Sequence, residues 1–297
     1  MTDAVTASRE QTATRLLDAS VRHSYDPAVQ IDWSAPLDPD RFWIPPERSS
    51  LYGTDLWQQL SHEQRVELTK HEVASAASCG VWFETILMEM LLRQYYDQDP
   101  RSRHAQYALT EVADECRHSI MFGRLIEKLD CPPYRAGWVD HNLGRYLKAT
   151  ATGPQMYAAI LIAEEILDTF QREIMADDTL QPLIRMVARI HVVEEARHVR
   201  YARDELVRQS TSGWPWTRAY TRLSVGWSAY VIADRLYHPD IYAAVGIPPA
   251  VGRAAARANP HHQATMRWAA AKVSGYLTDL GLIAGPTRAF WRRANLI

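Results

Sequence analysis

Apolar residues recur at helical spacing over most of the chain from about residue 55 onward. Ser61, followed by Gln64 three residues later, predicts a capping box that opens a helix running to about Tyr96. The same periodicity continues in the ranges 102–129, 153–175, 180–208, 215–235, 248–257 and 261–282. No alternating run long enough for a strand stands out. The pattern therefore predicts an all-α fold built around a helical bundle.

The first 53 residues differ from the rest, since they read as a short helix followed by irregular chain. Prolines are frequent between Asp26 and Pro46, which excludes a helix there, and Trp33 and Trp43 lie among them. We expect this segment to wrap a surface of the bundle. The predicted organisation is an N-terminal helix with a proline- and tryptophan-rich wrapping segment (1–53), a bundle (54–235) and a C-terminal helical extension packing on it (236–297).

Composition narrows the class of protein. The chain has 297 residues, 47% of them hydrophobic, and a formal net charge of -2, so no overall field attracts nucleic acid or an anionic membrane. Its three cysteines are too few and too scattered for a disulfide framework or a zinc ribbon. The N-terminus lacks a signal pattern, and the apolar run Met156–Ala163 is too short to span a membrane. We expect a soluble, cytoplasmic protein.

Two of the predicted helices share a local motif. Residues 114–118 read Asp-Glu-Cys-Arg-His and residues 194–198 read Glu-Glu-Ala-Arg-His. In each, the Glu and the His three positions later lie on one face of the helix, about one turn apart. A single Glu-x-x-His is usually a solvated surface pair, but two copies with the same flanking residues inside long helices are harder to attribute to chance.

Both motifs lie on core-facing stripes. Glu115 and His118 share a stripe with Phe122, whereas Glu195 and His198 share one with residues such as Ile184, Ala188 and His191. Glu84 and Glu164 also lie among apolar positions, and the neighbouring Glu165, which falls toward the solvent edge near Arg172, stays open as an alternative to Glu164. An unpaired charge in such positions costs several kcal/mol, roughly, so a partner must neutralise these groups.

A pair of metal ions is the partner that fits this set of residues. The candidate ligands are Glu84, Glu115, His118, Glu164, His191, Glu195 and His198. Four carboxylates balance two divalent cations, and carboxylate with imidazole suits iron or manganese better than zinc or an iron–sulfur cluster. One Glu from each of two helices and a Glu-x-x-His from each of two others is the pattern of ferritin-like di-iron bundles. We expect Asp114, Glu194, Arg117 and Arg197 to hydrogen-bond the ligand imidazoles or form inter-helix ion pairs.

His191 adds a third histidine, giving His-x-x-x-Glu-x-x-His on one face of the helix. From about Leu56 to Val245, the chain resembles the p-aminobenzoate N-oxygenase family of di-iron arylamine oxygenases from antibiotic biosynthesis. The segment 237–246 is also similar to the C-terminal region of that family. The resemblance implies a ferritin-like di-iron bundle with an extra histidine ligand on the last metal-binding helix. It also implies that all seven candidates above are metal ligands.

The resemblance further implies an enzyme with two iron ions, manganese being possible, and O2 as co-substrate. A peroxo-type intermediate would convert an aromatic amine to a hydroxylamine, and further to a nitroso or nitro product. The electrons would come from an external reductase, and by analogy the protein would be a homodimer. A di-iron C-hydroxylase, a ferroxidase or iron-binding protein, and a non-catalytic interaction module are the alternatives. The sequence identifies no substrate-binding residue, because aromatics such as Trp82, Phe83, Tyr157 and Phe170 are more often simple packing.

Overall fold

The structure is a computed structural model that describes residues 2–210 and 215–297, with side chains described from residue 8 to 210 and from residue 216 onward. Within these ranges the regular structure is α-helical with short 3-10 segments, and no strand occurs. The predicted all-α fold, a four-helix bundle with additional helices, is confirmed.

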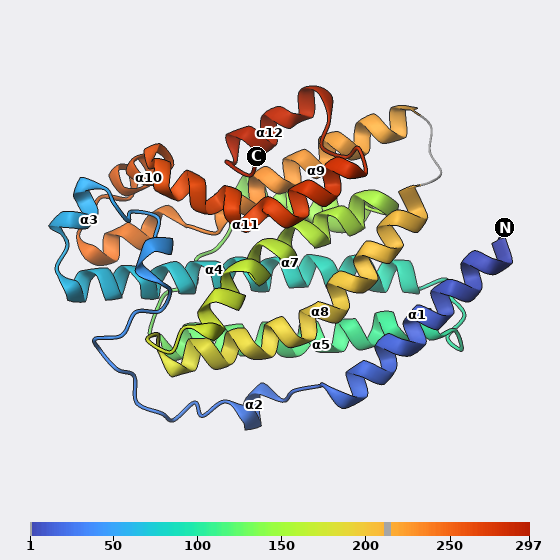
Figure 1. Cartoon of the computed structure of the whole chain (residues 1–297), viewed down its shortest axis with the longest axis horizontal. Helices are drawn as coiled ribbons and strands as arrows, with labels where there is room; N and C mark the ends of the chain where they lie inside the picture. Colours follow the sequence, from blue (N-terminus) through green and yellow to red (C-terminus); the bar gives the residue numbers. More distant parts are fainter. Residues whose placement is uncertain (1, 211–214) are drawn as a thin grey trace.

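Four long helices form the bundle, and they are arranged as two pairs (Figure 1). One pair is α4 (His62–Tyr95) with α5 (Arg103–Lys128), and the other is α7 (Gly153–Ala176) with α8 (Pro182–Ser210). The capping box predicted at the start of α4 is confirmed, with Ser61 Oγ accepting from Gln64 N at 3.2 Å and Gln64 Oε1 accepting from Ser61 N at 3.0 Å.

Further helices cover the bundle on two sides (Figure 1). On one side α1 (Thr2–Arg22) packs on α5 and α8. On the other, α9 (Pro215–Arg235) and α11 (Pro260–Asp279) pack on α7, and α12 (Arg288–Arg293) packs on α9. The remaining elements are α2 (Pro27–Gln30), η1 (Pro46–Arg48), α3 (Asp55–Gln59), α6 (Trp138–Thr150), η2 (Pro239–Val245), α10 (Pro249–Ala258) and η3 (Gly285–Thr287).

The helices differ from the prediction in several places. Prolines were expected to exclude a helix between Asp26 and Pro46, but α2 forms one turn there, because proline is tolerated in the first turn and Asp26 caps it. Helices α3 and α12 also lie outside the predicted ranges. The N-terminal helix α1 is 21 residues long rather than short. Helix α6, which packs on α4, is not among the predicted ranges. Gly137 precedes it without a side-chain cap, so the sequence lacks the usual signal for the start of a helix there.

The proline-rich segment after α1 runs over the bundle and is tied to it. Trp43 is buried, and the carbonyl of Phe42 accepts a hydrogen bond from the backbone N–H of Gln181 at 3.0 Å. The guanidinium of Arg124, on α5, lies 4.5 Å from the ring centre of Trp33. Hydrogen bonding and aromatic contact therefore hold this irregular chain against α5 and the start of α8.

The buried apolar residues form two clusters along the bundle. One contains the second half of α4 with residues of α1, α7, α9, α11 and α12, and the other contains the first half of α4 with the wrapping segment, the end of α5 and the start of α8. Buried acidic and histidine side chains of the bundle helices separate the two clusters. The polar layer that the sequence predicts thus lies at mid-height in the bundle.

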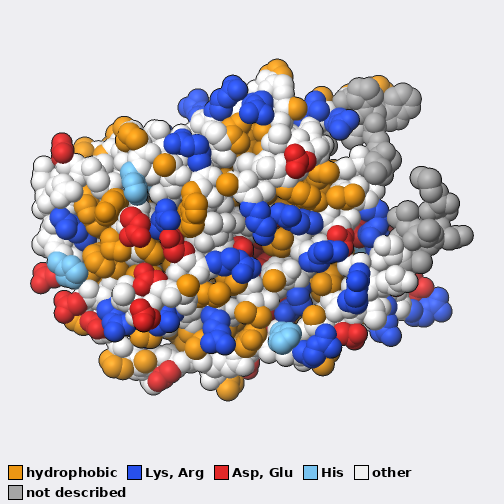
Figure 2. All heavy atoms as spheres, viewed as in Figure 1, with side chains coloured by type: hydrophobic (Ala, Val, Ile, Leu, Met, Phe, Trp, Pro, Cys, Tyr) orange, Lys and Arg blue, Asp and Glu red, His pale blue; other side chains and the backbone are white. Residues whose placement is uncertain are grey.

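Among the described residues, α4 is the one helix long and apolar enough to cross a membrane by length and composition. Half of its apolar window is buried inside the protein, and α4 packs against α5, α6, α7 and α9. These contacts are those of a core helix. On the face drawn in Figure 2, acidic and basic side chains are both spread among hydrophobic ones.

Candidate metal centre

The seven predicted ligands come together from the four bundle helices. Helix α4 carries Glu84, α5 carries Glu115 and His118, α7 carries Glu164, and α8 carries His191, Glu195 and His198. Each is at most 3% exposed. The spacings of three, four and seven residues keep the members on α5 and α8 on one face of each helix, which turns them inward.

Glu115 and Glu195 lie at the middle of the group. The Nδ1 atom of His198 is 3.0 Å from both Glu115 Oε1 and Glu195 Oε1. The Nδ1 atom of His118 is 3.1 Å from Glu195 Oε1 and 3.3 Å from Glu115 Oε2. Both imidazoles therefore present Nδ1 to the same two carboxylates, one from each helix pair.

The other three side chains surround this central group. His191 Nε2 is 3.7 Å from Glu84 Oε1 and 3.7 Å from Glu195 Oε1. Glu164 forms a group with His191 and Glu195 in which the candidate ligand atoms all lie within 4.8 Å of one another. Two further groups of this kind are Glu84 with His118 and His191, and Glu115 with Glu195 and His198.

The outward nitrogen of each central imidazole bonds to a carboxylate on the opposite helix. His118 Nε2, from α5, lies 2.8 Å from Glu194 Oε2 on α8. His198 Nε2, from α8, lies 3.2 Å from Asp114 Oδ2 on α5. A carboxylate that accepts a hydrogen bond from Nε2–H orients the ring, so that Nδ1 can offer its lone pair to a cation at the centre.

Two arginines complete this outer layer, as expected from the repeated motif. Arg197 donates to Asp114 Oδ2 at 3.0 Å, and Arg117 also donates to Asp114. Arg117 Nη2 lies 3.9 Å from Glu194 Oε1 and Arg197 Nη2 lies 3.8 Å from the same atom. The negative charges of Asp114 and Glu194 are thereby compensated on the side facing away from the centre.

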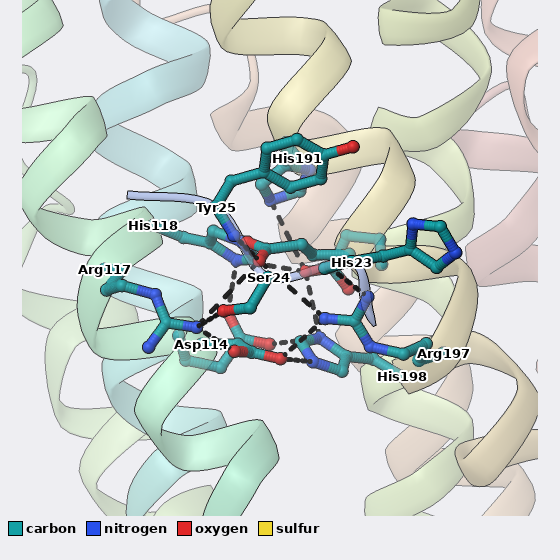
Figure 3. A network of polar contacts seen from close by, with 12 residues as sticks. His23, Ser24, Tyr25, Asp114, Arg117, His118, His191, Arg197 and His198 are labelled. Atoms are coloured by element: carbon teal, nitrogen blue, oxygen red, sulfur yellow. Dashed lines mark hydrogen bonds and ion pairs between the residues drawn. The ribbon is translucent and has the colours of Figure 1, made fainter. Parts of the chain in front are cut away.

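The segment after α1 closes over the same network (Figure 3). Arg197 donates to the carbonyl of His23 at 2.8 Å, and Arg117 donates to Ser24 Oγ at 3.1 Å. The backbone N–H of Tyr25 donates to Glu194 Oε1 at 2.9 Å. Residues 23–25 thus act as a clasp across α5 and α8. Tyr25 is joined to His118 through Glu194 alone, whereas His23 and Ser24 are joined to His198 through an arginine and Asp114.

Hydrogen bonds within the protein satisfy the candidate ligand carboxylates only in part. Three of them have a buried oxygen without a hydrogen-bond partner, namely Glu84 Oε1, Glu115 Oε1 and Glu195 Oε2. Burial, together with the negative charges of Glu195, Glu115 and Glu84, raises the pKa of Glu164 well above its ordinary value. Cations between these groups would relieve both penalties, and the oxygen and imidazole donors suit iron or manganese. The buried Glu and His groups fit a dinuclear metal site.

The choice between Glu164 and Glu165 becomes clear from their partners. From its position on the helix, Glu165 was expected near Arg172 at the solvent edge. This expectation is wrong, because Glu165 is 1% exposed and binds Arg203 through contacts of 2.8 and 2.6 Å. Arg172 binds Asp168 instead, at 2.7 Å. Glu164, not Glu165, therefore lies among the candidate metal-binding groups.

Two polar residues near the centre were missed by the sequence reasoning. Gln171 Oε1 lies 2.7 Å from His191 Nδ1 and holds the ring from the side facing away from the other ligands. Glu111, one turn before Glu115, is 1% exposed and has one oxygen without a hydrogen-bond partner, and burial raises its pKa to about 8. Both continue the stripes of predicted ligands, seven residues after Glu164 and four before Glu115, which is the signal that could have identified them.

A family model described as P-aminobenzoate N-oxygenase AurF matches residues 6–281. Uncharacterized proteins of Mycobacterium bovis and Mycobacterium tuberculosis are 31% identical over 203 residues, which cover 64% of this chain and 58% of each relative. The chain thus matches little more than half the length of these curated relatives. Among solved structures, a mutant of an R2-like ligand-binding oxidase with an aerobically reconstituted Mn/Fe cofactor has a TM-score of 0.44 and 13% identity, over 97% of this chain and 92% of that one.

Proposed function

Since the chain belongs to the p-aminobenzoate N-oxygenase AurF family, we propose that it is a dinuclear non-haem iron oxygenase that oxidises an amine nitrogen with O2. One observation carries the proposal. Four carboxylates and three imidazoles are buried at mid-bundle, and three of the carboxylates have an oxygen without a hydrogen-bond partner. A folded core tolerates such a set when cations share it.

In this proposal the seven residues predicted from the sequence hold the two ions. Glu115 and Glu195 would form the middle of the ligand set, because both central imidazoles contact both of them. Glu84 and Glu164 serve as outer carboxylates, and His191 is the additional imidazole. Iron bound here supplies the redox chemistry with O2, as a cofactor does in general, whereas the protein supplies position and charge.

The outer residues act on the imidazoles rather than on substrate. Asp114 and Glu194 accept hydrogen bonds from the imidazole Nε2–H groups, and Arg117 and Arg197 hold these two carboxylates in place. Removing such partners typically weakens metal binding about 10- to 100-fold. These four are therefore positioning residues.

The overall reaction needs an electron donor. Oxidising R–NH2 to R–NHOH with O2 consumes two electrons and two protons and releases one water, and further oxygenation of the hydroxylamine leads toward the nitroso and nitro levels. The electrons come from a separate reductase. We further propose that the protein works in the cytoplasm as a homodimer, with residues 54–235 as the metal-binding bundle, 1–53 as its wrapping segment and 236–297 as its extension.

The test combines metal analysis with oxygen exposure. The purified protein is loaded with Fe(II) without air and mixed with O2, with and without an arylamine, while absorption is recorded and products are identified by mass spectrometry. About two irons per chain and an amine product one oxygen heavier support the proposal. Oxygen on carbon would instead identify a C-hydroxylase, and iron oxidation with no organic product would identify a ferroxidase. Failure to retain iron would contradict the metal centre itself.

A further inference from the structure

A polar pocket lies among the helices that cover the bundle, where α9, α10, α11 and α12 meet. Its volume is about 350 Å³, which is in the range of sites for small molecules. None of the seven candidate metal ligands is among the residues that line it. The pocket is therefore a feature that the proposed oxygenase chemistry does not use.

Four arginines from two helices line this pocket. They are Arg253 and Arg257 of α10 and Arg292 and Arg293 of α12. Of the residues described as lining it, one is a carboxylate, Asp234 of α9. His262 also lines it but adds no charge near neutral pH, because burial lowers the pKa of its imidazole to about 4. Positive charge therefore exceeds negative charge in the pocket, although the whole chain has a formal net charge of -2.

Asp234 compensates the arginines of α10 only in part. Its carboxylate accepts hydrogen bonds from Arg253 Nη2 at 2.8 and 3.1 Å, and it also accepts one from Arg257. Two guanidinium groups of the pocket thus share one negative charge. These contacts also show that the arginines of α10 are placed so that both can bind one anionic group.

The arginines of α12 have no such carboxylate. Within the part of the chain that the structure describes, neither Arg292 nor Arg293 forms an ion pair. Both are exposed, and the guanidinium of Arg293 lies 5.7 Å from the ring centre of Tyr230. Basic side chains gather over α12 on the face drawn in Figure 2. An anion in the pocket would therefore meet uncompensated positive charge on the side of α12.

We propose that this pocket binds an organic phosphate. Guanidinium groups match phosphate oxygens through pairs of parallel hydrogen bonds. A phosphate monoester carries about 1.5 to 2 negative charges at pH 7, so it suits several arginines better than a monocarboxylate does. The pocket is larger than a phosphate group alone requires, and Tyr230, Ala233 and Met266 line it with apolar surface. The ligand class is thus a phosphate ester of a small molecule with an apolar or aromatic body, and it does not depend on the proposed oxygenase activity.

Three compounds with the same phenyl ring test the charge requirement on the full chain. Phenyl phosphate is a dianion at mildly alkaline pH, benzoate is a monoanion, and benzyl alcohol is neutral. We expect calorimetry at low salt to show phenyl phosphate binding about tenfold or more tightly than either of the others. It should also bind more tightly than inorganic phosphate, which lacks the ring. Its affinity should fall as salt is added, because exposed charges are screened.

A double variant tests the arginines of α12. Arg292→Gln combined with Arg293→Gln removes the two uncompensated charges, and because both residues are exposed the fold should be retained. We expect the affinity for phenyl phosphate to fall about tenfold or more. The control combines Arg145→Gln with Arg267→Gln, which removes two exposed arginines that do not line the pocket, and it should bind phenyl phosphate as the native protein does.

Three results would contradict the proposal. An equal loss of affinity in the two double variants would reveal a general effect of charge rather than a site. Benzoate binding as tightly as phenyl phosphate would overturn the choice of a dianion, and inorganic phosphate binding as tightly would overturn the choice of an organic ligand. Iron content should be the same in all variants, so these outcomes are separate from those that test the proposed oxygenase.

Discussion

Asp114 lies next to a proposed ligand of its own helix, yet its carboxylate bonds to His198 of the opposite helix, with 3.2 Å between Oδ2 and Nε2. Glu194 and His118 make the same contact in the reverse direction at 2.8 Å. The two copies of the acidic-Glu-x-Arg-His motif are therefore interlocked. Each copy supplies two candidate ligands and also the carboxylate that orients the imidazole of the other copy.

Neutralising these carboxylates should weaken metal binding. Asp114→Asn and Glu194→Gln leave the shape of the side chain nearly unchanged but remove the negative charge of the group that accepts the hydrogen bond from the imidazole Nε2–H. We expect each change to lower iron affinity about 10- to 100-fold, measured by competition with a chromogenic chelator. Glu63→Gln, on the exposed start of α4, is the control. Native affinity in both variants would show that the outer carboxylates do not position the imidazoles.

His191 should shape the reaction with O2 rather than the fold. His191→Ala removes the third imidazole from a group that keeps four carboxylates and two histidines, so we expect reduced iron occupancy and at least a several-fold change in the rate of oxygen reaction. Gln171→Leu removes the partner of His191 Nδ1, at 2.7 Å, and should act in the same direction more weakly. Stopped-flow absorption with iron analysis measures both effects. An unchanged oxygen rate in His191→Ala would refute this role.

Metal binding should stabilise the protein measurably. The buried carboxylates repel one another, and burial with neighbouring negative charges raises the pKa of Glu164. Iron at about 100 times its dissociation constant would add roughly 2.7 kcal/mol per site, or about 5 °C or more in Tm. Differential scanning calorimetry of chelator-treated and iron-loaded protein measures the shift. Glu115→Gln should reduce it, and equal Tm values for both forms of the native protein would argue against a buried metal site.

Breaking the clasp should destabilise the fold. Arg197 is 6% exposed and binds both Asp114 and the carbonyl of His23. Arg197→Met leaves Asp114 without this partner, and we expect a loss of about 3–5 kcal/mol in the free energy of unfolding, measured with urea. Arg189→Met, at an exposed position of the same helix, should stay within about 0.5 kcal/mol of the native protein. A similar small loss in Arg197→Met would mean that the clasp carries little energy.

Glu72 should make stability depend on pH. Burial raises its pKa to about 7, against the lowering effect of the hydrogen bonds from Ser50 and Ser49. The folded state therefore keeps a proton that the unfolded chain, with a Glu pKa of about 4.3, releases earlier. Stability from this group is complete below that lower pKa and is lost as pH rises through about 7. We expect Glu72→Gln to remove a slope worth on the order of 3 kcal/mol between pH 4 and 8 in urea titrations; parallel curves would contradict this assignment.

The long helices could be predicted because their signals are local. The capping box at Ser61 and the Asp99-Pro100 break lie beside the ends of α4, whose bounds differ from the prediction by one residue at each end. The candidate ligands could be predicted because a charged residue on an apolar stripe can be recognised from its own helix, without knowing how the neighbouring helices pack. Helix α6 could not, since Gly137 gives its start no side-chain cap and Gly144 lies inside it.

The hydrogen-bond partners of the predicted residues could not be predicted, because they depend on how the helices pack against one another. The contact of Glu165 with Arg203 joins α7 to α8. Glu165 is therefore buried, although its position on α7 alone places it at the solvent edge. Glu72 reads as an ordinary boundary residue until Ser49 and Ser50, more than twenty residues earlier, are brought against it. The family assignment came from His191, a single residue at a local spacing, and the match over residues 6–281 confirms it.

The clasp of residues 23–25 can form only at a late stage in the synthesis of the chain. Tyr25 and its partner Glu194 are separated by 169 positions. At about 5–20 residues per second, a ribosome needs on the order of ten seconds to go from one to the other. During that interval residues 23–25 have already been synthesised, whereas α8 has not. The outer network around the candidate metal centre can therefore close only late in synthesis, after the fourth bundle helix has emerged.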